Sequence, residues 1–195
     1  EKLREFRGLC NDVGWSGRSP DLVLVDCRYL GDVVYQFIRE SGRRYVPVMG
    51  HGTGQSSNYS PPEKVTNYIA AIGSGWHVKR VTDQRLFRAH IDADEWKSWV
   101  HQRFRVSPGE PGSLTLFVDL EKRHRVYSRH ITAERQVQDV LPKRGIVTRW
   151  DNSDGKPNHY LDSTCYASIA GNMVGFSLTK QEQAKETPKP SKVNF

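Results

Sequence analysis

Cysteine is scarce in this sequence, and long apolar runs are missing from it. The cysteines, Cys10, Cys27 and Cys165, lie far apart and form no CxxC pair, a pattern that argues against a disulfide framework and a zinc site. No apolar run approaches the roughly 18–20 residues that cross a bilayer, and no signal peptide opens the sequence. We therefore expect a protein of a reducing compartment that does not bind membranes.

A phosphate-binding loop is also missing. The segment "GHGTGQSS" imitates one, but the P-loop pattern GxxxxGK[ST] needs a lysine that this segment does not contain. We interpret residues 51–64 as a polar surface loop rich in Gly, Ser and Pro. Such a loop can touch a nucleic-acid backbone without binding a nucleotide.

Acidic residues are outnumbered by basic ones, 22 against 29, which gives a formal net charge of +7. This surplus favours an acidic partner, most commonly nucleic acid, although a basic domain without such a partner is the alternative. The length of 195 residues suits one domain. We place this domain at residues 1–176 and a polar tail or linker at residues 177–195. The opening "EKLREFRGLC" is typical of the inside of a helix, so we expect a part of a longer chain.

Apolar runs typical of strands alternate along the sequence with stretches that have helical spacing. Strands are predicted at residues 21–27, 43–50, 76–82, 113–119 and 145–150. Helices are predicted at residues 2–10, 31–42, 92–104, 132–141 and 158–175. The alternation predicts an α/β fold with helices on the faces of a central sheet. In such sheets, functional sites gather at the carboxyl ends of the strands.

Capping signals mark two of the predicted helices. Asp92, with Glu95 three residues later, matches a capping box. Asn158 is suited to cap the last helix, and Gly175 is suited to end it.

Two aspartates occupy positions that are otherwise apolar. Asp26 ends the run "LVLVD", which fits a strand buried on both faces, and Asp162 lies among the apolar residues of the last predicted helix. A buried charge without a partner is costly, and a shared divalent cation, held by carboxylate oxygens, is one explanation. The alternative is structural: Asp26 caps a turn, and Asp162 pairs with a nearby arginine or histidine.

Four stretches in this order resemble the nuclease portion of the large terminase subunit of tailed bacteriophages, in its lambda-type branch. They are "LVLVDCRYLGDVVYQFIRESG", "IDADEWKSWVHQRF", "GEPGSLTLF" and "PNHYLDSTCYASIAGNMVG". The resemblance implies an RNase H-like fold with a mixed central sheet flanked by helices. It also implies metal-dependent cleavage of double-stranded DNA concatemers during genome packaging, in the cytoplasm of the infected host. The implied cofactor is Mg²⁺ or Mn²⁺ in a two-metal site, and the implied protein partners are the terminase small subunit and the portal protein.

The same resemblance assigns roles to particular acids. Asp26 matches the second acidic position of RNase H-like nucleases, and Asp162 matches the third. The first strand, with its aspartate, is expected upstream of Glu1, together with the packaging ATPase domain. Asp119 is a candidate substitute ligand, and His159, which shares a helical face with Asp162, is a candidate supporting residue. Asp92 and Asp94 are better explained as helix-cap groups.

Basic residues near the predicted site are candidates for binding DNA phosphates, without sequence specificity and with strong salt dependence. These residues are Arg28, Arg43, Arg44, Lys79, Arg80, Arg123, Arg125 and Lys156. The segment "EKRHRVYSRH" is the densest of these clusters. Two alternatives to the nuclease remain: a DNA-binding or packaging module that is catalytically incomplete, and an unrelated RNase H-like resolvase or transposase.

Overall fold

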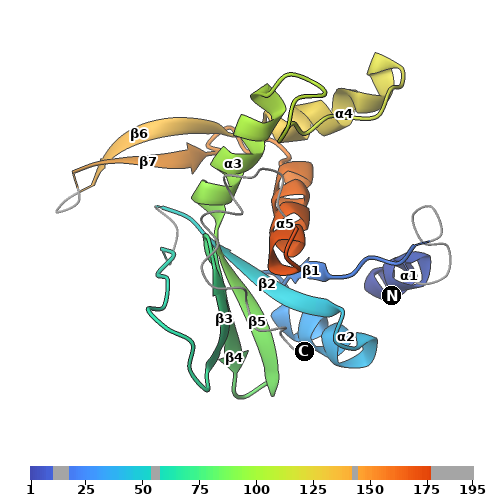
Figure 1. Ribbon diagram of the computed structural model, residues 1–195, viewed down its shortest axis with the longest axis vertical. Coiled ribbons are helices and arrows are strands. Elements are labelled where there is room, and N and C mark those ends of the chain that lie inside the picture. Colours follow the sequence, from blue (N-terminus) through green and yellow to red (C-terminus); the bar gives the residue numbers. More distant parts are fainter. Residues whose placement is uncertain (11–17, 54–57, 142–144, 177–195) are drawn as a thin grey trace.

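The computed structural model describes residues 1–10, 18–53, 58–141 and 145–176, and the predicted tail at 177–195 lies outside these residues. Its centre is a five-stranded sheet in the order β1-β2-β5-β4-β3 (Figure 1). The strands are β1 (Val23–Asp26), β2 (Tyr45–His51), β3 (Ile69–Gly73), β4 (Trp76–Val81) and β5 (Leu86–Asp92). The predicted fold class, a mixed sheet flanked by helices, is confirmed.

The strand directions decide which ends of the strands meet. β1, β2 and β5 are parallel neighbours, whereas β4 is antiparallel to both β5 and β3. The three parallel strands therefore end on the same side of the sheet, at their carboxyl ends, and Asp26 ends β1 there. This is the edge at which α/β sheets usually carry their sites.

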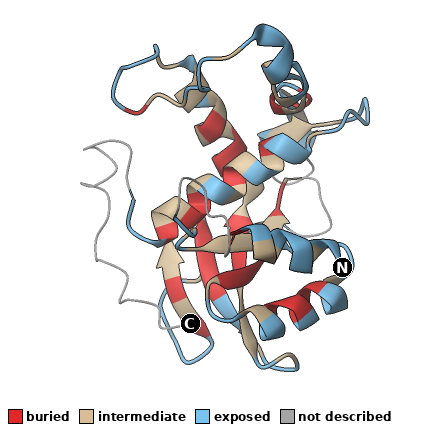
Figure 2. Ribbon diagram, turned by 90° about the vertical axis from the view of Figure 1, so that its right-hand side faces the viewer, coloured by how far each residue is buried: buried red, intermediate tan, exposed pale blue. Residues whose placement is uncertain are grey.

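Helices cover both faces of the sheet. They are α1 (Lys2–Gly8), α2 (Gly31–Ser41), α3 (Ala93–Arg105), α4 (Glu121–Ile131) and α5 (His159–Met173). α2 packs on one face, and α3 and α5 pack on the other. Buried residues concentrate on the sheet and on the helix faces that touch it, whereas α4 is mostly exposed (Figure 2).

The alternation of side chains along β1 explains why the protein has two apolar cores. Leu22 and Leu24 pack into the core that contains α3 and α5, whereas Val23 and Val25 pack into the core that contains α2. Successive side chains of a strand point to opposite faces, so Asp26 points with Leu24 toward α5. The indole Nε1 of Trp76 on β4 donates to Asn172 Oδ1 at 2.7 Å, which fixes the far end of α5 across the sheet.

The strand at 21–27 has a core on each face, but the predicted full burial is not observed. β1 lies at the edge of the sheet, and its apolar side chains are only half-buried. A cavity of about 820 Å³ opens between β1, α1 and α5. An apolar run indicates that both faces of a strand are covered, but it carries no information about whether both edges are paired.

Two further predicted elements are wrong. Residues 135–141, within the predicted helix at 132–141, form β6 (Arg135–Leu141), which pairs with β7 (Gly145–Asp151) in a two-stranded ribbon. The strand pairing and the ion pairs of Arg149 with Asp139 and Asp151 outweigh the local helical preference. Residues 113–119 form no strand, because no neighbouring strand pairs with them among the described residues. β3 and β5 are two strands that the apolar pattern did not indicate.

Candidate active site

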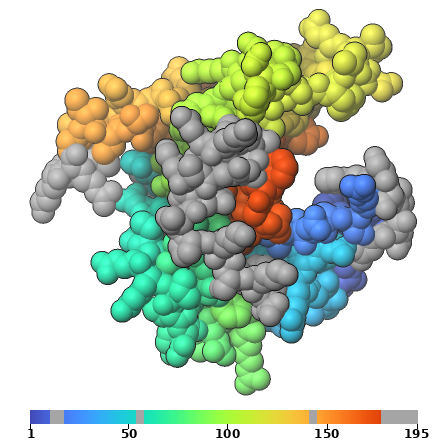
Figure 3. Space-filling view, in the orientation of Figure 1, coloured from blue at the N-terminus to red at the C-terminus, as the bar shows by residue number. Residues whose placement is uncertain are grey.

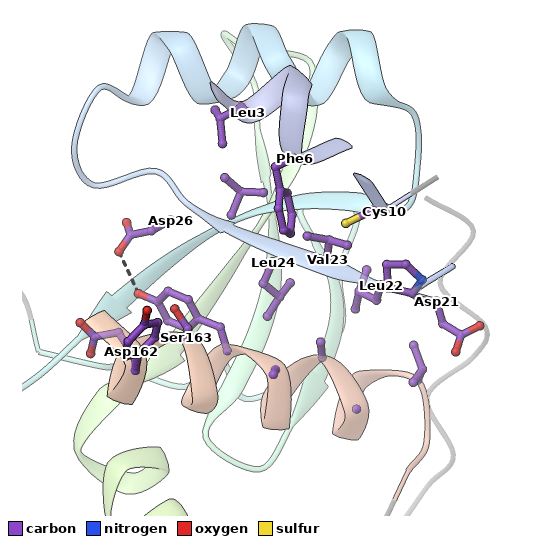
Figure 4. Close-up of a pocket in the computed structure, with 18 of the residues that line it drawn as sticks. Leu3, Phe6, Cys10, Asp21, Leu22, Val23, Leu24, Asp26, Asp162 and Ser163 are labelled. Carbon is purple, nitrogen blue, oxygen red and sulfur yellow. Dashed lines mark hydrogen bonds between the residues drawn. The ribbon is translucent and has the colours of Figure 1, made fainter. Parts of the chain in front are cut away.

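Asp26 projects from the carboxyl end of β1 and is held by two hydrogen bonds. The backbone N–H of Arg28 donates to its Oδ1 at 2.7 Å, which is the turn cap that the structural alternative predicted. The hydroxyl of Tyr166, 140 residues away on α5, donates to its Oδ2 at 2.9 Å (Figure 4). The second bond connects the strand to the helix, so Asp26 does more than cap a local turn.

Asp162 lies in the first turn of α5 and is also held from two sides. The Nζ of Lys97 lies 3.5 Å from its Oδ1, and the amide of Asn158 donates to its Oδ2 at 3.1 Å. Its ion-pair partner is thus a lysine rather than the predicted arginine or histidine. Burial raises the pKa of Asp162, and the charge of Lys97 partly offsets this effect.

The two aspartates line the same cavity, between β1 and α5 (Figure 4). They are close enough for the charge of Asp26 to contribute to the raised pKa of Asp162. Much of the remaining wall is apolar and comes from α1, β1 and α5. The surface is hollowed beside α5, between α4 and the N-terminal segment (Figure 3). The fold therefore places the two predicted acids together.

Glu134 is a third acid near this site, and the sequence analysis missed it. It is 6% exposed, both its carboxylate oxygens lie 2.8 Å from Lys97 Nζ, and its Oε1 accepts from Asn158 at 2.6 Å. The signal that could have found it is a glutamate beside the apolar residues Ile131 and Ala133. That signal becomes informative only with the knowledge that the segment is buried.

Lys97 is a buried ammonium group on α3. Its side chain lies between Glu134 and Asp162. Burial by itself lowers the pKa of Lys97, but the charges of Asp162 and Glu134 outweigh burial, and the net shift is upward. Lys97 is therefore charged at neutral pH and neutralises part of the negative charge of the site.

Asn158 stands at the N-cap position of α5, as predicted, but its side chain caps no backbone group. Its amide instead donates to both Glu134 and Asp162. The expectation of a side-chain cap is wrong, because the carboxylates of buried Glu134 and partly exposed Asp162 compete successfully for the amide hydrogens.

The other candidate acids lie in different surroundings. Asp92 caps α3 by accepting from Glu95 N at 3.0 Å, which confirms the predicted cap. Asp94 accepts from the backbone N–H groups of Thr53, at 2.6 Å, and Trp150, at 3.3 Å. It therefore connects α3 to the end of β2 and to the ribbon.

Asp119 and His159 were the predicted supporting residues. Asp119 accepts from Leu120 N at 2.7 Å and pairs with Arg123 at 2.9 Å, at the start of α4. His159 lines the same cavity as Asp162. Its ring centre lies 5.8 Å from that of His130.

The fold separates the basic candidates into three groups. Arg28 lies beside Asp26 and donates to the carbonyl of Gly50. The residues near α4 and the start of α5 are each in an ion pair: Arg123 with Asp119, Arg125 with Glu121, and Lys156 with Asp154. The third group lies toward the other end of the strands, where the parallel strands begin: Arg43, Arg44, Lys79 and Arg80.

A second polar cluster lies on the α2 side of the sheet, apart from the acids. The buried rings of His51, His77 and His90, from β2, β4 and β5, stack with centre distances of 5.1 Å and 5.0 Å. His51 Nε2 and His90 Nδ1 are 2.8 Å apart, and Arg88 hydrogen-bonds to His90. Burial, reinforced by neighbouring positive charge, lowers the pKa of His77 to about 4 and that of His90 to about 3.

The carboxylates of the site suit one hard divalent cation. Mg²⁺ is commonly held by one or two carboxylates together with waters and substrate phosphate, and Asp26 and Asp162 both face one cavity. Each of their oxygens accepts one hydrogen bond or ion pair, and a carboxylate oxygen has a further lone pair. Among the described residues, no group of three or more His, Cys, Asp or Glu side chains is placed to hold a metal ion.

The mixed sheet and its flanking helices are consistent with a nuclease fold, and Asp26 and Asp162 lie together where the parallel strands end. The sequence matches the family model of the terminase large subunit gpA endonuclease domain over residues 10–184. The chain therefore belongs to this family, and its role is that of an endonuclease in phage DNA packaging. No curated protein and no solved structure matches the chain. No helix in the part of the chain that the structure describes is long and apolar enough to cross a membrane.

Proposed function

We propose that this chain cleaves double-stranded DNA concatemers during genome packaging, by metal-dependent hydrolysis of phosphodiester bonds. The observation that carries the proposal is the pairing of Asp26 and Asp162 at one cavity, from elements far apart in the sequence. Family membership supports the nuclease chemistry. The paired carboxylates support a divalent cofactor, Mg²⁺ or Mn²⁺, whose ligands they would be.

The residues around the aspartates would set the geometry of this chemistry. When bound, a divalent ion supplies an activated water molecule and stabilises the developing charge on the leaving oxygen. Tyr166 holds Asp26 from one side, and Lys97 and Asn158 hold Asp162 from the other. Because these bonds fix both carboxylates before a ligand binds, the site is preorganised.

DNA would approach the hollow beside α5. Arg28, next to Asp26, is the basic candidate nearest to the acids, and the basic helix α4 packs against α5. Contacts of this kind grip the phosphate backbone without reading the base sequence. The terminase small subunit and the portal protein are the protein partners that we propose from the family.

A plasmid cleavage assay tests the proposal. The 195-residue chain is incubated with supercoiled plasmid and Mg²⁺ or Mn²⁺, beside the variants Asp26→Asn and Asp162→Asn. We expect metal-dependent cutting by the parent chain and a loss of at least about 100-fold in each variant, the lower range for removal of a catalytic group. Asp83→Asn, in the turn between β4 and β5, is the matched control and should cut normally.

Two outcomes would favour the alternative functions. Plasmid binding without cutting, unchanged in both variants, would indicate a packaging module that binds DNA but is catalytically incomplete. Preferential cutting of four-way junctions over linear duplex would indicate a resolvase-like enzyme.

A further inference from the structure

We propose that Lys97 occupies the place of a second metal ion, so that this site binds one divalent ion, at Asp26 and Asp162. The inference rests on the proposed metal-dependent nuclease and refines it, because the resemblance alone implies two metal ions. Lys97 would then be a positioning residue that acts through Asp162 and Glu134.

The contacts of Lys97 are those expected of a cation shared by two carboxylates. Its Nζ lies 2.8 Å from both oxygens of Glu134 and 3.5 Å from Oδ1 of Asp162. A second metal ion in a two-metal site sits about 3.5–4 Å from the first and needs oxygen ligands beyond any carboxylate that the two ions share. Glu134 is the acid that shares Lys97 with Asp162, and Lys97 already contacts both its oxygens.

Burial makes the ion pair of Lys97 with Glu134 difficult for a metal ion to displace. The side chains of Lys97 and Glu134 are 10% and 3% exposed. A metal ion that displaced Lys97 from Glu134 would leave the buried ammonium group of Lys97 without a partner, which is costly. The amide of Asn158 adds a further hydrogen bond to Glu134 and thus helps to hold that carboxylate in place against Lys97.

The balance of charge also favours a single ion. The site contains three carboxylates, of Asp26, Asp162 and Glu134, and one ammonium group, of Lys97. Their formal charges leave an excess of two negative charges, and the guanidinium group of Arg28 beside Asp26 reduces this excess further, so one divalent cation is sufficient to compensate it. A second divalent cation would produce a positive excess in a partly buried site, before any phosphate binds.

The stoichiometry of Mn²⁺ binding tests this inference. Isothermal titration calorimetry counts the ions bound per chain, and electron paramagnetic resonance detects spin coupling between two neighbouring Mn²⁺ ions. We expect one ion per chain and an uncoupled spectrum. Lys97→Met frees two carboxylates, and we expect it to bind a second ion and to show the coupled spectrum. The double variant Lys97→Met/Glu134→Gln also removes the negative charge of Glu134, and we expect it to bind one ion per chain, like the parent.

The number of bound ions in each protein supports or refutes the proposed role of Lys97. Two coupled ions in the parent chain would overturn the role of Lys97 and leave the proposed nuclease intact. A single ion in Lys97→Met would also overturn it. No bound ion in the parent chain would refute the metal-dependent function together with this inference. If Lys97→Met fails to fold, the parent chain still decides by its stoichiometry, and the double variant, which is neutral at both positions, provides the folded comparison.

Discussion

The histidine stack should make the protein lose stability as the pH falls below neutrality. His77 and His90 are buried in a neutral form, with folded pKa values of about 4 and about 3, against an ordinary value of 6.5. In the unfolded chain they bind protons at higher pH than in the folded protein. Their contribution to stability is therefore complete above pH 6.5 and is lost as the pH falls toward 4 and 3.

The size of the effect follows from the shift. One pKa unit corresponds to about 1.4 kcal/mol, so the lowered pKa of His77 corresponds to about 3 kcal/mol. His90 is shifted further, but part of its shift comes from the charge of His77, so the two effects are not independent. We therefore expect the free energy of unfolding to fall by at least about 3 kcal/mol between pH 6.5 and pH 4 because of this stack.

Urea unfolding at half-unit pH intervals, followed by tryptophan fluorescence, measures this dependence. The comparison variant is His77→Gln/His90→Gln, in which neither side chain takes up a proton, so the difference between the two pH profiles isolates the stack. We expect the variant to be less stable at pH 7 but to have a markedly shallower profile between pH 6.5 and 4. Parallel profiles for the two proteins would refute the reasoning.

Three further changes test other contacts. Tyr166→Phe removes the hydrogen bond to Asp26 and should weaken Mn²⁺ binding about 10-fold with little change in melting temperature; unchanged affinity in calorimetry would contradict this. Lys97→Ala leaves Glu134 buried without its partner and should cost about 3–5 kcal/mol in urea unfolding; a loss below about 1 kcal/mol would contradict the burial described above. Gly75→Ala should cost about 1–2 kcal/mol, because Gly75 has φ +67° and an added Cβ would lie 2.7 Å from Glu95; wild-type stability would contradict it.

The two aspartates could be predicted from the sequence because each violates its local pattern. Asp26 interrupts an apolar strand and Asp162 interrupts an apolar helix, and a carboxylate among apolar residues needs a compensating partner. The parallel connection from β1 to β2 then fixes the edge at which Asp26 lies. The helix starting at residue 159 could be predicted because its apolar positions recur every four residues.

Glu134 and Lys97 could not be predicted in the same way. Each is unremarkable in its own segment, and 37 residues separate them. Their burial arises only when α3, the start of β6 and α5 pack together. The strand β6 escaped prediction for a related reason, because residues 135–141 become a strand only through pairing with 145–151.

The separation of the two aspartates along the chain also sets when the candidate site is complete. Asp26 belongs to the first strand of the sheet, whereas Asp162 and Tyr166 belong to the last described helix. A nascent chain on the ribosome therefore has half of the cavity, without the acid or the hydroxyl that complete it, until α5 has emerged and docked. The proposed cleavage, which needs both aspartates, is therefore expected to be absent from chains that end before α5.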